Sequence, residues 1–308
     1  MPSLSHTQME VWGQCPRKWA LLYAEQVPAA PNEYFILGRA IHAAFEADGQ
    51  RHIAGLPPLN TSEILEVFSE RLAQEVMQRD PLGLLADRTG LLNVRGASIV
   101  NAYIQKVQRR YSPVSVEEQF HVPIAGLSRD LESQGQWEFA GIVDARTEPT
   151  TGPTIIDFKT STKPWARGKE LKGAQASAYL WAEHVARRQP RATRFTFIVF
   201  VSPESTHARG ICEVDVRTTS RTQSQLETFG GTVRQVVADI SNARKSGVYD
   251  PCPSPLCGWC TVLGHCSSGQ KWLAERGRTP SVPVLRPDSY AAVANTLPAT
   301  GPQPKVAT

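Results

Sequence analysis

The chain has 308 residues, of which 41% are hydrophobic and 20% are charged, a composition typical of a soluble globular protein with one large domain or two modest ones. This excludes a wholly disordered chain, a collagen-like repeat and a minimal disulfide scaffold. The best candidate for a membrane segment, Phe195–Val201, is far shorter than the roughly 18 residues that a membrane helix needs, and no basic stretch followed by an apolar core opens the sequence. We therefore expect a cytoplasmic protein that makes no membrane contact.

The net charge is +4, but basic residues are concentrated in one segment. Residues 159–194 hold nine Lys and Arg side chains against two acidic ones. Such a local excess suits a polyanionic partner such as nucleic acid, although a solvated basic helix face explains it equally well. The charge pattern therefore needs support from chemistry nearby.

The first part of the chain has the pattern of helices. Apolar residues recur at helical spacing, with prolines between the segments, in Thr7–Tyr23, Phe35–Phe45, Ile64–Met77 and Val94–Tyr111. We interpret this part as an N-terminal helical arm.

The pattern then changes to that of an α/β core. Strands are predicted at residues 114–124, 137–146, 154–160, 195–201 and 210–216, and helices at 169–188 and 220–245. The second and third strands should form a hairpin. From residue 277 onward the chain holds six prolines and no sustained periodicity, which predicts a disordered tail. The predicted parts are thus an arm (1–112), a core (113–248), a cysteine-rich region (249–276) and a tail (277–308).

Six cysteines are present, four of them within fifteen residues near the C-terminus. Those four are Cys252, Cys257, Cys260 and Cys266. In a cytosolic protein, clustered cysteines bind metal more often than they form disulfides. Cys15 lies far away in the sequence, and Cys212, in an alternating strand, is most simply a buried apolar residue.

Two acids and a lysine fall on the predicted hairpin. Asp144 ends one strand, and Asp157 and Lys159 lie on one face of the next, because strand side chains alternate. If the hairpin is in register, Asp144 approaches Asp157, and the two carboxylates repel each other unless a proton or a divalent cation lies between them. Oxygen ligands of this kind favour Mg²⁺ or Mn²⁺. Two surface acids and a salt-bridged lysine remain the simpler interpretation of this motif alone.

Two predicted helices carry residue pairs one turn apart, and therefore on one helix face. Gly38 and His42 form one pair, and Gln175 and Tyr179 form the other. A glycine permits close approach of the backbone, and an imidazole can ligate a transition metal. Taken singly, such pairs more often serve packing than function.

In chain order these motifs are GxxxH (Gly38, His42), GxxD (Gly141, Asp144), DxK (Asp157, Lys159) and QxxxY (Gln175, Tyr179). Together they resemble the RecB-like branch of the PD-(D/E)XK nuclease superfamily. The resemblance implies a restriction-endonuclease-like α/β core, a mixed sheet flanked by helices, with a C-terminal iron–sulfur region beyond it. It also implies metal-dependent hydrolysis of phosphodiester bonds in DNA.

The cysteine spacing adds to this resemblance. One N-terminal cysteine plus C-x2-C-x5-C beyond the core is similar to the iron–sulfur nucleases of the AddB and CRISPR-associated exonuclease type, in which four thiolates hold a 4Fe-4S cluster. The resemblance implies that the cluster ligands are Cys15, Cys257, Cys260 and Cys266. The rival is a local Zn²⁺ site in which Cys252 joins the other three C-terminal cysteines, with or without His265.

The same resemblance assigns roles in the active site. It implies that one or two Mg²⁺ or Mn²⁺ ions are held by His42, Asp144, Asp157 and the backbone carbonyl of Phe158. Lys159 would orient or help deprotonate the attacking water and offset charge on the phosphorus. Gln175 and Tyr179 would position the scissile nucleotide or the lysine.

The basic segment follows directly from the DxK strand, so its cations lie where a strand of phosphates would enter. The first of them are Lys163, Arg167, Lys169 and Lys172. Two roles remain open for Trp165, stacking on a nucleic-acid base or packing against the protein. These expectations lead to a DNA exonuclease for single strands or DNA ends in recombination, repair or phage DNA metabolism, with other proteins of those processes as partners. The alternative is a DNA-binding iron–sulfur or zinc subunit of a larger complex that has lost catalysis.

Overall fold

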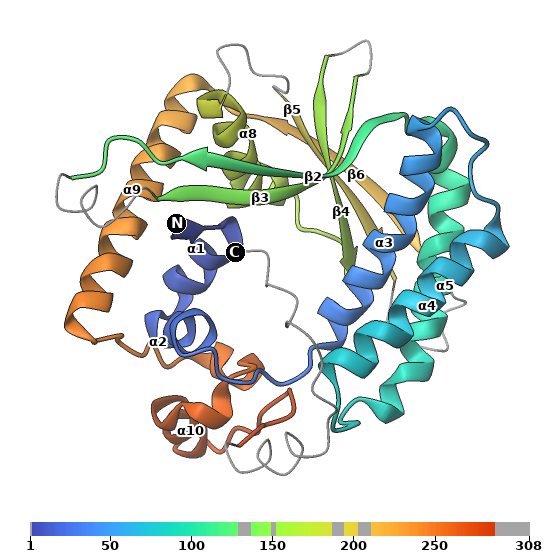
Figure 1. Cartoon of the computed structure of the whole chain (residues 1–308). Coiled ribbons are helices and arrows are strands. Elements are labelled where there is room, and N and C mark those ends of the chain that lie inside the picture. The colour runs from blue at the N-terminus through green and yellow to red at the C-terminus, as the bar shows by residue number, and fades with distance from the viewer. Residues whose placement is uncertain (1, 129–136, 149–151, 187–193, 203–210, 287–308) are drawn as a thin grey trace.

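The computed structural model describes residues 2–128, 137–148, 152–186, 194–202 and 211–286. A mixed sheet lies at the centre, with helices on both of its faces (Figure 1). Its strands are β1 (Ser3–Leu4), β2 (Pro113–Pro123), β3 (Glu138–Thr147), β4 (Thr154–Ser161), β5 (Arg194–Val201) and β6 (Glu213–Ser220). The predicted mixed sheet flanked by helices is therefore confirmed.

Strand β3 pairs with three other strands. On one edge, β2 runs antiparallel to it. On the other edge, β1 pairs in parallel with Glu138 and Phe139, and β4 pairs antiparallel with residues 145–147. Strand β4 then pairs in parallel with β5, and β5 pairs antiparallel with β6. The predicted β3–β4 pairing is confirmed, and the two strands stop pairing beyond Ala145 and Ile156.

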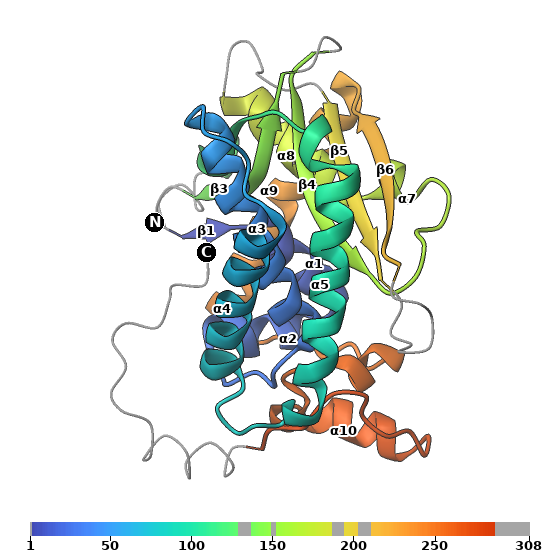
Figure 2. The same ribbon diagram turned by 90° about the vertical axis from the view of Figure 1, so that its right-hand side faces the viewer.

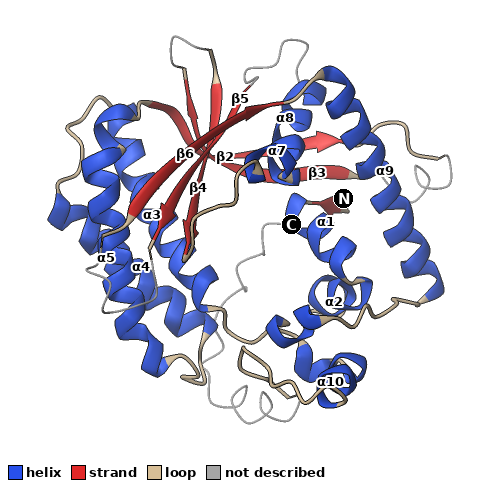
Figure 3. Cartoon of the chain, turned by 180° about the vertical axis from the view of Figure 1, so that it is seen from behind, coloured by secondary structure: helices blue, strands red, loops and turns tan. Residues whose placement is uncertain are grey.

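Helices cover the two faces of the sheet in separate groups. They are α1 (His6–Gln14), α2 (Pro16–Trp19), α3 (Glu33–Ile53), α4 (Thr61–Arg79), α5 (Thr89–Lys106), α7 (Lys169–Lys172), α8 (Ala174–Ala186), α9 (Gln223–Ser246) and α10 (Ser267–Ala274). One buried core joins the sheet to α1, α2, α8 and α9, and a second joins its other face to α3, α4 and α5. Figure 2 shows α3, α4 and α5 side by side, and Figure 3 shows α7, α8 and α9 from behind. Within the described ranges, no helix combines the length and apolar character that a bilayer crossing requires.

The N-terminal helices differ from the single segment that the sequence predicts. The chain turns extended at Cys15, and α2 begins with Pro16, whose ring cannot continue the preceding helix. Helices α1 and α2 pack in the first core and α3 to α5 in the second. The segment predicted as one helical arm therefore contributes to both faces of the sheet.

The predicted helix at 169–188 is two helices, α7 and α8, separated at Gly173. The backbone of Gly173 is extended, and the Arg221 guanidinium donates hydrogen bonds to the carbonyls of Gly173 and Glu170. These bonds satisfy carbonyls that the end of a helix leaves without partners. The next helix, α9, begins after the N-cap Thr222, which forms a capping box with Gln225.

The chain beyond α10 folds back on the cysteine-rich region. The backbone N–H of Ser281 donates to the carbonyl of Gly258 at 2.7 Å, and Leu285 is buried. The disordered tail predicted from residue 277 therefore does not describe residues 277–286, and residues 287–308 lie outside the described residues.

Candidate metal centre and active site

The candidate site lies where β3 and β4 stop pairing. The last paired residues nearest the site are Ala145 and Ile156, so the next position of the register places Asp144 opposite Asp157. The backbone N–H of Phe158 donates a hydrogen bond to Asp144 Oδ2 at 2.7 Å. This bond holds the Asp144 carboxylate against β4 after the ladder has ended.

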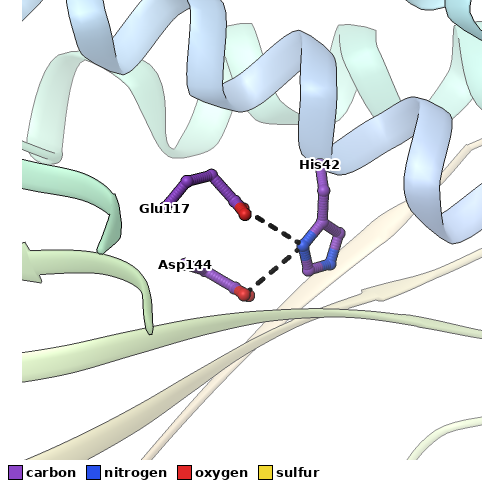
Figure 4. Close-up of side chains that lie close together, drawn as sticks. All are labelled: His42, Glu117 and Asp144. Carbon is purple, nitrogen blue, oxygen red and sulfur yellow. Dashed lines mark ion pairs between the residues drawn. The ribbon is translucent and has the colours of Figure 1, made fainter. Parts of the chain in front are cut away.

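Helix α3 brings His42 to the same place. Its Nδ1 lies 3.4 Å from Asp144 Oδ1 and 3.9 Å from Glu117 Oε1, and Figure 4 shows both carboxylates pointing toward this nitrogen. Its Nε2 donates to the carbonyl of Phe158 over 3.0 Å. The ligand atoms of His42, Glu117 and Asp144 all lie within 4.8 Å of one another.

Glu117 was not among the residues predicted for this site. It lies on β2 between two residues that pair with β3, Val116 with Ala145 and Glu118 with Val143. Its φ of 46° is in the left-handed region, which is unfavourable for a non-glycine residue. Such strain concentrates at functional sites. An acidic pair within a strand was visible in the sequence, but this local backbone twist, which accompanies the turn of Glu117 toward His42, was not.

The DxK residues form a second group beside this one. Lys159 Nζ lies 2.7 Å from Asp157 Oδ2, and Gln175 Nε2 donates to Asp157 Oδ1 at 2.6 Å. Tyr179 contacts Gln175 and the backbone of Ile142 through its hydroxyl. The Gln175 and Tyr179 pair on α8 therefore reaches the Asp157 carboxylate through Gln175.

The close packing of these charged groups shifts their pKa values. Burial opposes a charge on His42, but Asp144 and Glu117 outweigh it and raise the pKa of His42 to about 10. Burial also raises the pKa of Asp157, to about 6, with a contribution from Asp144. Burial would lower the pKa of Lys159, but Asp157 and Asp144 keep it above its usual range. Against the effect of burial, His42, Lys159 and the Phe158 N–H hold the pKa of Asp144 below its usual range.

These donors fit a divalent cation. One imidazole nitrogen and two carboxylates converge, and oxygen-rich sets with a histidine suit Mn²⁺ or Mg²⁺. A cation would replace the proton that the two acids stabilise on Nδ1. Asp157 is nearby, since the charge of Asp144 contributes to the raised pKa of Asp157. The site therefore offers a hard cation three direct ligands and an adjoining carboxylate.

The two motif glycines have different surroundings. A Cβ at Gly141 would lie 2.6 Å from the Phe120 ring, which faces it across β2 and β3. Glycine here lets the ring cover the strand beside Asp144. A Cβ at Gly38 would meet no atom within 4 Å, so the helix is open at that point.

The predicted phosphate-binding cations lie after β4. All four, Lys163, Arg167, Lys169 and Lys172, are exposed. Trp165 packs on Phe197 with ring centroids 5.1 Å apart, and Lys169 Nζ lies 4.2 Å from the indole centroid. Contact with the core favours packing as the role of this tryptophan. Three more basic residues of the same segment, Arg187, Arg188 and Arg191, lie outside the described residues.

The cysteines from the two ends of the fold line one pocket. These are Cys15, Cys252, Cys257, Cys260 and Cys266. A Cβ at Gly269 would lie in ordinary van der Waals contact with Cys257 Sγ (3.4 Å) and Cys266 Sγ (3.6 Å), so this glycine packs beside both sulfurs. His265 lines a different pocket. Cys212 is buried in the second core, as predicted.

Backbone N–H groups point at these sulfurs. Those of Lys18 and Cys252 lie 3.4 Å from Cys15 Sγ, and that of Ser254 lies 3.4 Å from Cys257 Sγ. Hydrogen bonds to sulfur stabilise thiolates and tune the clusters that they hold. The pocket therefore fits a thiolate-bound metal group, and Cys252 contacts Cys15 through both its backbone N–H and its thiol.

A sequence model of one family, described as the PD-(D/E)XK nuclease superfamily, matches residues 3–267. No curated protein gives a significant match. Among solved structures, the protein SSO0001 is 11% identical with a TM-score of 0.40, over 87% of this chain and 86% of that one. A protein of Eubacterium rectale named "Putative exonuclease" is 12% identical with a TM-score of 0.48, over 87% of each chain. Because the family model covers most of the sequence, including all four motifs, the chain belongs to the PD-(D/E)XK nuclease superfamily.

Proposed function

We propose that the protein is a Mg²⁺- or Mn²⁺-dependent DNA exonuclease of the RecB-like, iron–sulfur type. It acts on single strands or DNA ends in recombination, repair or phage DNA metabolism. The observation that carries the proposal is the meeting of His42 and Asp144 beside the Asp157–Lys159 pair, from three separate elements of the fold. Family membership supports nuclease chemistry on DNA in general.

The ligands of the cation are His42, Glu117 and Asp144, with Asp157 and the Phe158 carbonyl beside them. When bound, the cation supplies Lewis-acid chemistry, which activates water and stabilises negative charge on phosphate oxygens. The protein keeps the ligands in place through the Phe158 backbone, whose N–H binds Asp144 and whose carbonyl binds His42.

Lys159 acts as a cation in this scheme. Against the effect of burial, Asp157 and Asp144 keep the pKa of Lys159 above its usual range, so in the metal-free protein the ammonium is charged at neutral pH. It donates to Asp157, and from there it can donate to a phosphate oxygen as charge develops. Gln175 holds the other oxygen of Asp157, and Tyr179 holds Gln175. These two helix residues therefore position the lysine and its carboxylate.

The cysteine pocket is proposed to hold a 4Fe-4S cluster through Cys15, Cys257, Cys260 and Cys266. Its ligands come from both ends of the folded region, so the cluster crosslinks a very long loop and stabilises the fold. Lys163, Arg167, Lys169 and Lys172 are proposed to contact phosphates next to the site.

One experiment tests the activity and the cluster together. The protein is purified without oxygen, its iron and zinc are measured, and it is given end-labelled single-stranded and duplex DNA with Mn²⁺, Mg²⁺ or EDTA. We expect brown protein with about four irons per chain, and release of short products only with a divalent cation. Failure to cleave any DNA substrate, with or without a divalent cation, would instead indicate a DNA-binding subunit. A colourless protein with one zinc per chain would overturn the assignment of the cluster.

A further inference from the structure

A buried carboxylate on α4 holds three arginines at the protein surface. Glu75 is only 1% exposed, and its two oxygens bind Arg39 of α3 at 2.8 Å, Arg71 at 2.7 Å and Arg79 at 2.6 Å. The three guanidinium side chains remain 31–40% exposed. Each guanidinium carries five N–H donors, far more than one carboxylate can accept. The group therefore carries two net positive charges and spare donors that face solvent.

An exposed aromatic ring lies among these arginines. Phe35 is 51% exposed, although large apolar side chains are usually buried. The guanidinium carbon of Arg79 lies 4.8 Å from the ring centroid, and that of Arg39 lies 5.8 Å away. Unpaired nucleic-acid bases stack on aromatic rings and on guanidinium planes. We call Phe35, Arg39, Arg71 and Arg79 the arginine–phenylalanine surface.

This surface continues directly into the metal centre. Phe35, Arg39 and His42 are spaced by four and three residues, so they follow one face of α3. From Phe35 to His42 the helix rises by roughly 10 Å, which is about three nucleotides at the stacked spacing of about 3.4 Å. Gly38 lies between them, and a side chain there would meet no protein atom within 4 Å. A strand could therefore lie close to the helix backbone along this line.

The charges along this face of α3 favour one direction for a bound strand. Toward the N-terminus of α3 from His42 the helix face is basic. In the other direction Glu46 follows, and its carboxylate interacts with that of Glu117 and with the guanidinium of Arg71. A polyanion leaving the metal centre is therefore attracted toward Arg39, whereas toward Glu46 the carboxylates offset the charge of Arg71.

We infer that the arginine–phenylalanine surface binds the single-stranded segment of a DNA substrate next to the scissile phosphate. A base stacks on Phe35, and the guanidiniums of Arg39, Arg71 and Arg79 bind phosphates. A duplex keeps its bases stacked on each other, so only an unpaired base can use the ring. The inference rests on the proposed nuclease function and specifies how the substrate approaches the site.

The test is equilibrium binding in EDTA, where cleavage is off, to a fluorescein-labelled single-stranded oligonucleotide and to a blunt duplex of the same sequence. Phe35→Ala should weaken single-strand binding by about fivefold or more and leave duplex binding unchanged. Met77→Ala, which removes an exposed apolar side chain of the neighbouring helix α4, is the matched control and should bind both DNAs as the wild type does. In cleavage assays with Mn²⁺, Phe35→Ala should raise KM for single strands while kcat is kept.

Arg39→Ala provides a second, independent readout. Loss of one phosphate contact should make the salt dependence of single-strand binding shallower by about 0.7, and thermal unfolding shows whether the variant is still folded. Wild-type affinity of Phe35→Ala for single strands, or equal losses on both DNAs, would overturn the inference while the proposed nuclease stands. A wild-type protein that neither binds nor cleaves DNA would overturn the nuclease itself.

Discussion

Asp144, which lies one residue beyond the last pair of β3 and β4, accepts a hydrogen bond from the backbone N–H of Phe158 at 2.7 Å. The same carboxylate faces His42 through its other oxygen. One side chain therefore does two things: it closes the end of a ladder and it presents a ligand atom to the candidate metal centre.

Two substitutions of Asp144 separate these tasks. Both variants lose the ion pair with His42 and the stability that it contributes. Asp144→Asn keeps an oxygen for the Phe158 N–H, whereas Asp144→Ala leaves that N–H without a partner and should be about 1–3 kcal/mol less stable than Asp144→Asn. Both should lose metal-dependent cleavage. Denaturant unfolding and cleavage of labelled DNA measure the two effects, and substantial cleavage by Asp144→Asn would contradict its role as a ligand.

Lys159 and Asp157 should be needed for cleavage but not for DNA binding. Asp157→Ala and Lys159→Ala are each expected to lower cleavage by at least about a hundredfold while retaining affinity for DNA, because other cations contact the phosphates. Lys163→Ala is the matched control, since it removes an exposed lysine on the same segment and should weaken binding slightly with cleavage kept. Joint loss of binding and cleavage in the first two variants would indicate misfolding or a site elsewhere.

Metal binding should release a proton from His42. In the metal-free protein its raised pKa, about 10, stabilises the fold below about pH 6.5, and this contribution is lost as the pH rises through about 10. A cation must displace that proton, so Mn²⁺ affinity should rise by up to about tenfold per pH unit between pH 7 and 9. Titration calorimetry in buffers of different ionisation heat measures the release. His42→Gln should show weak binding without it, and pH-independent binding by the wild type would refute this assignment.

Glu117 should exchange stability for metal affinity. Glycine adopts a φ of 46° freely, so Glu117→Gly should relieve the strain and be about 1 kcal/mol more stable than Glu117→Ala, which loses the same ion pair with His42. It should also weaken Mn²⁺ binding, because one carboxylate is lost. Glu117→Ala is the matched control: it loses the ligand but keeps the strain. Equal stability of the two variants would show that the backbone at this position is not strained.

Cys15 should matter as much as the C-terminal cysteines. Cys15→Ala and Cys260→Ala should both lose iron and unfold at clearly lower temperature, because each removes a ligand of the proposed cluster. Cys252→Ala removes the thiol contact with Cys15 but keeps the backbone N–H bond and all four proposed ligands, so it should keep the iron. Iron analysis and thermal melts compare the three. Normal iron in Cys15→Ala together with iron loss in Cys252→Ala would favour a local C-terminal site.

The parts of the site that the sequence could predict are those encoded by regular periodicity. Strand alternation put Asp157 and Lys159 on one face, and helical spacing joined Gln175 to Tyr179; the structure has both pairs in contact. The separation of α7 from α8 at Gly173 depends on tertiary contacts, such as those of Arg221. The extended break at Cys15 is followed by Pro16, which is a local signal. β1 is only two residues long, too short to show a period.

Glu117 shows the limit most clearly. Two neighbouring glutamates on β2 have nearly the same sequence context, yet one faces His42 and the other binds Arg146. A single positive φ accompanies this difference. No local pattern specifies such a dihedral angle, because the surrounding sheet imposes it and the strand pairing offsets its strain energy.

The cysteine pocket has a consequence for how the protein is made. Cys15 and Cys252 are separated by 237 residues, and the backbone of one contacts the sulfur of the other. During translation the N-terminal thiol leaves the ribosome long before its partners exist. Until the last helix emerges, this cysteine is exposed to oxidants and to chaperones. Assembly of the pocket is therefore one of the final events in the synthesis and folding of the protein.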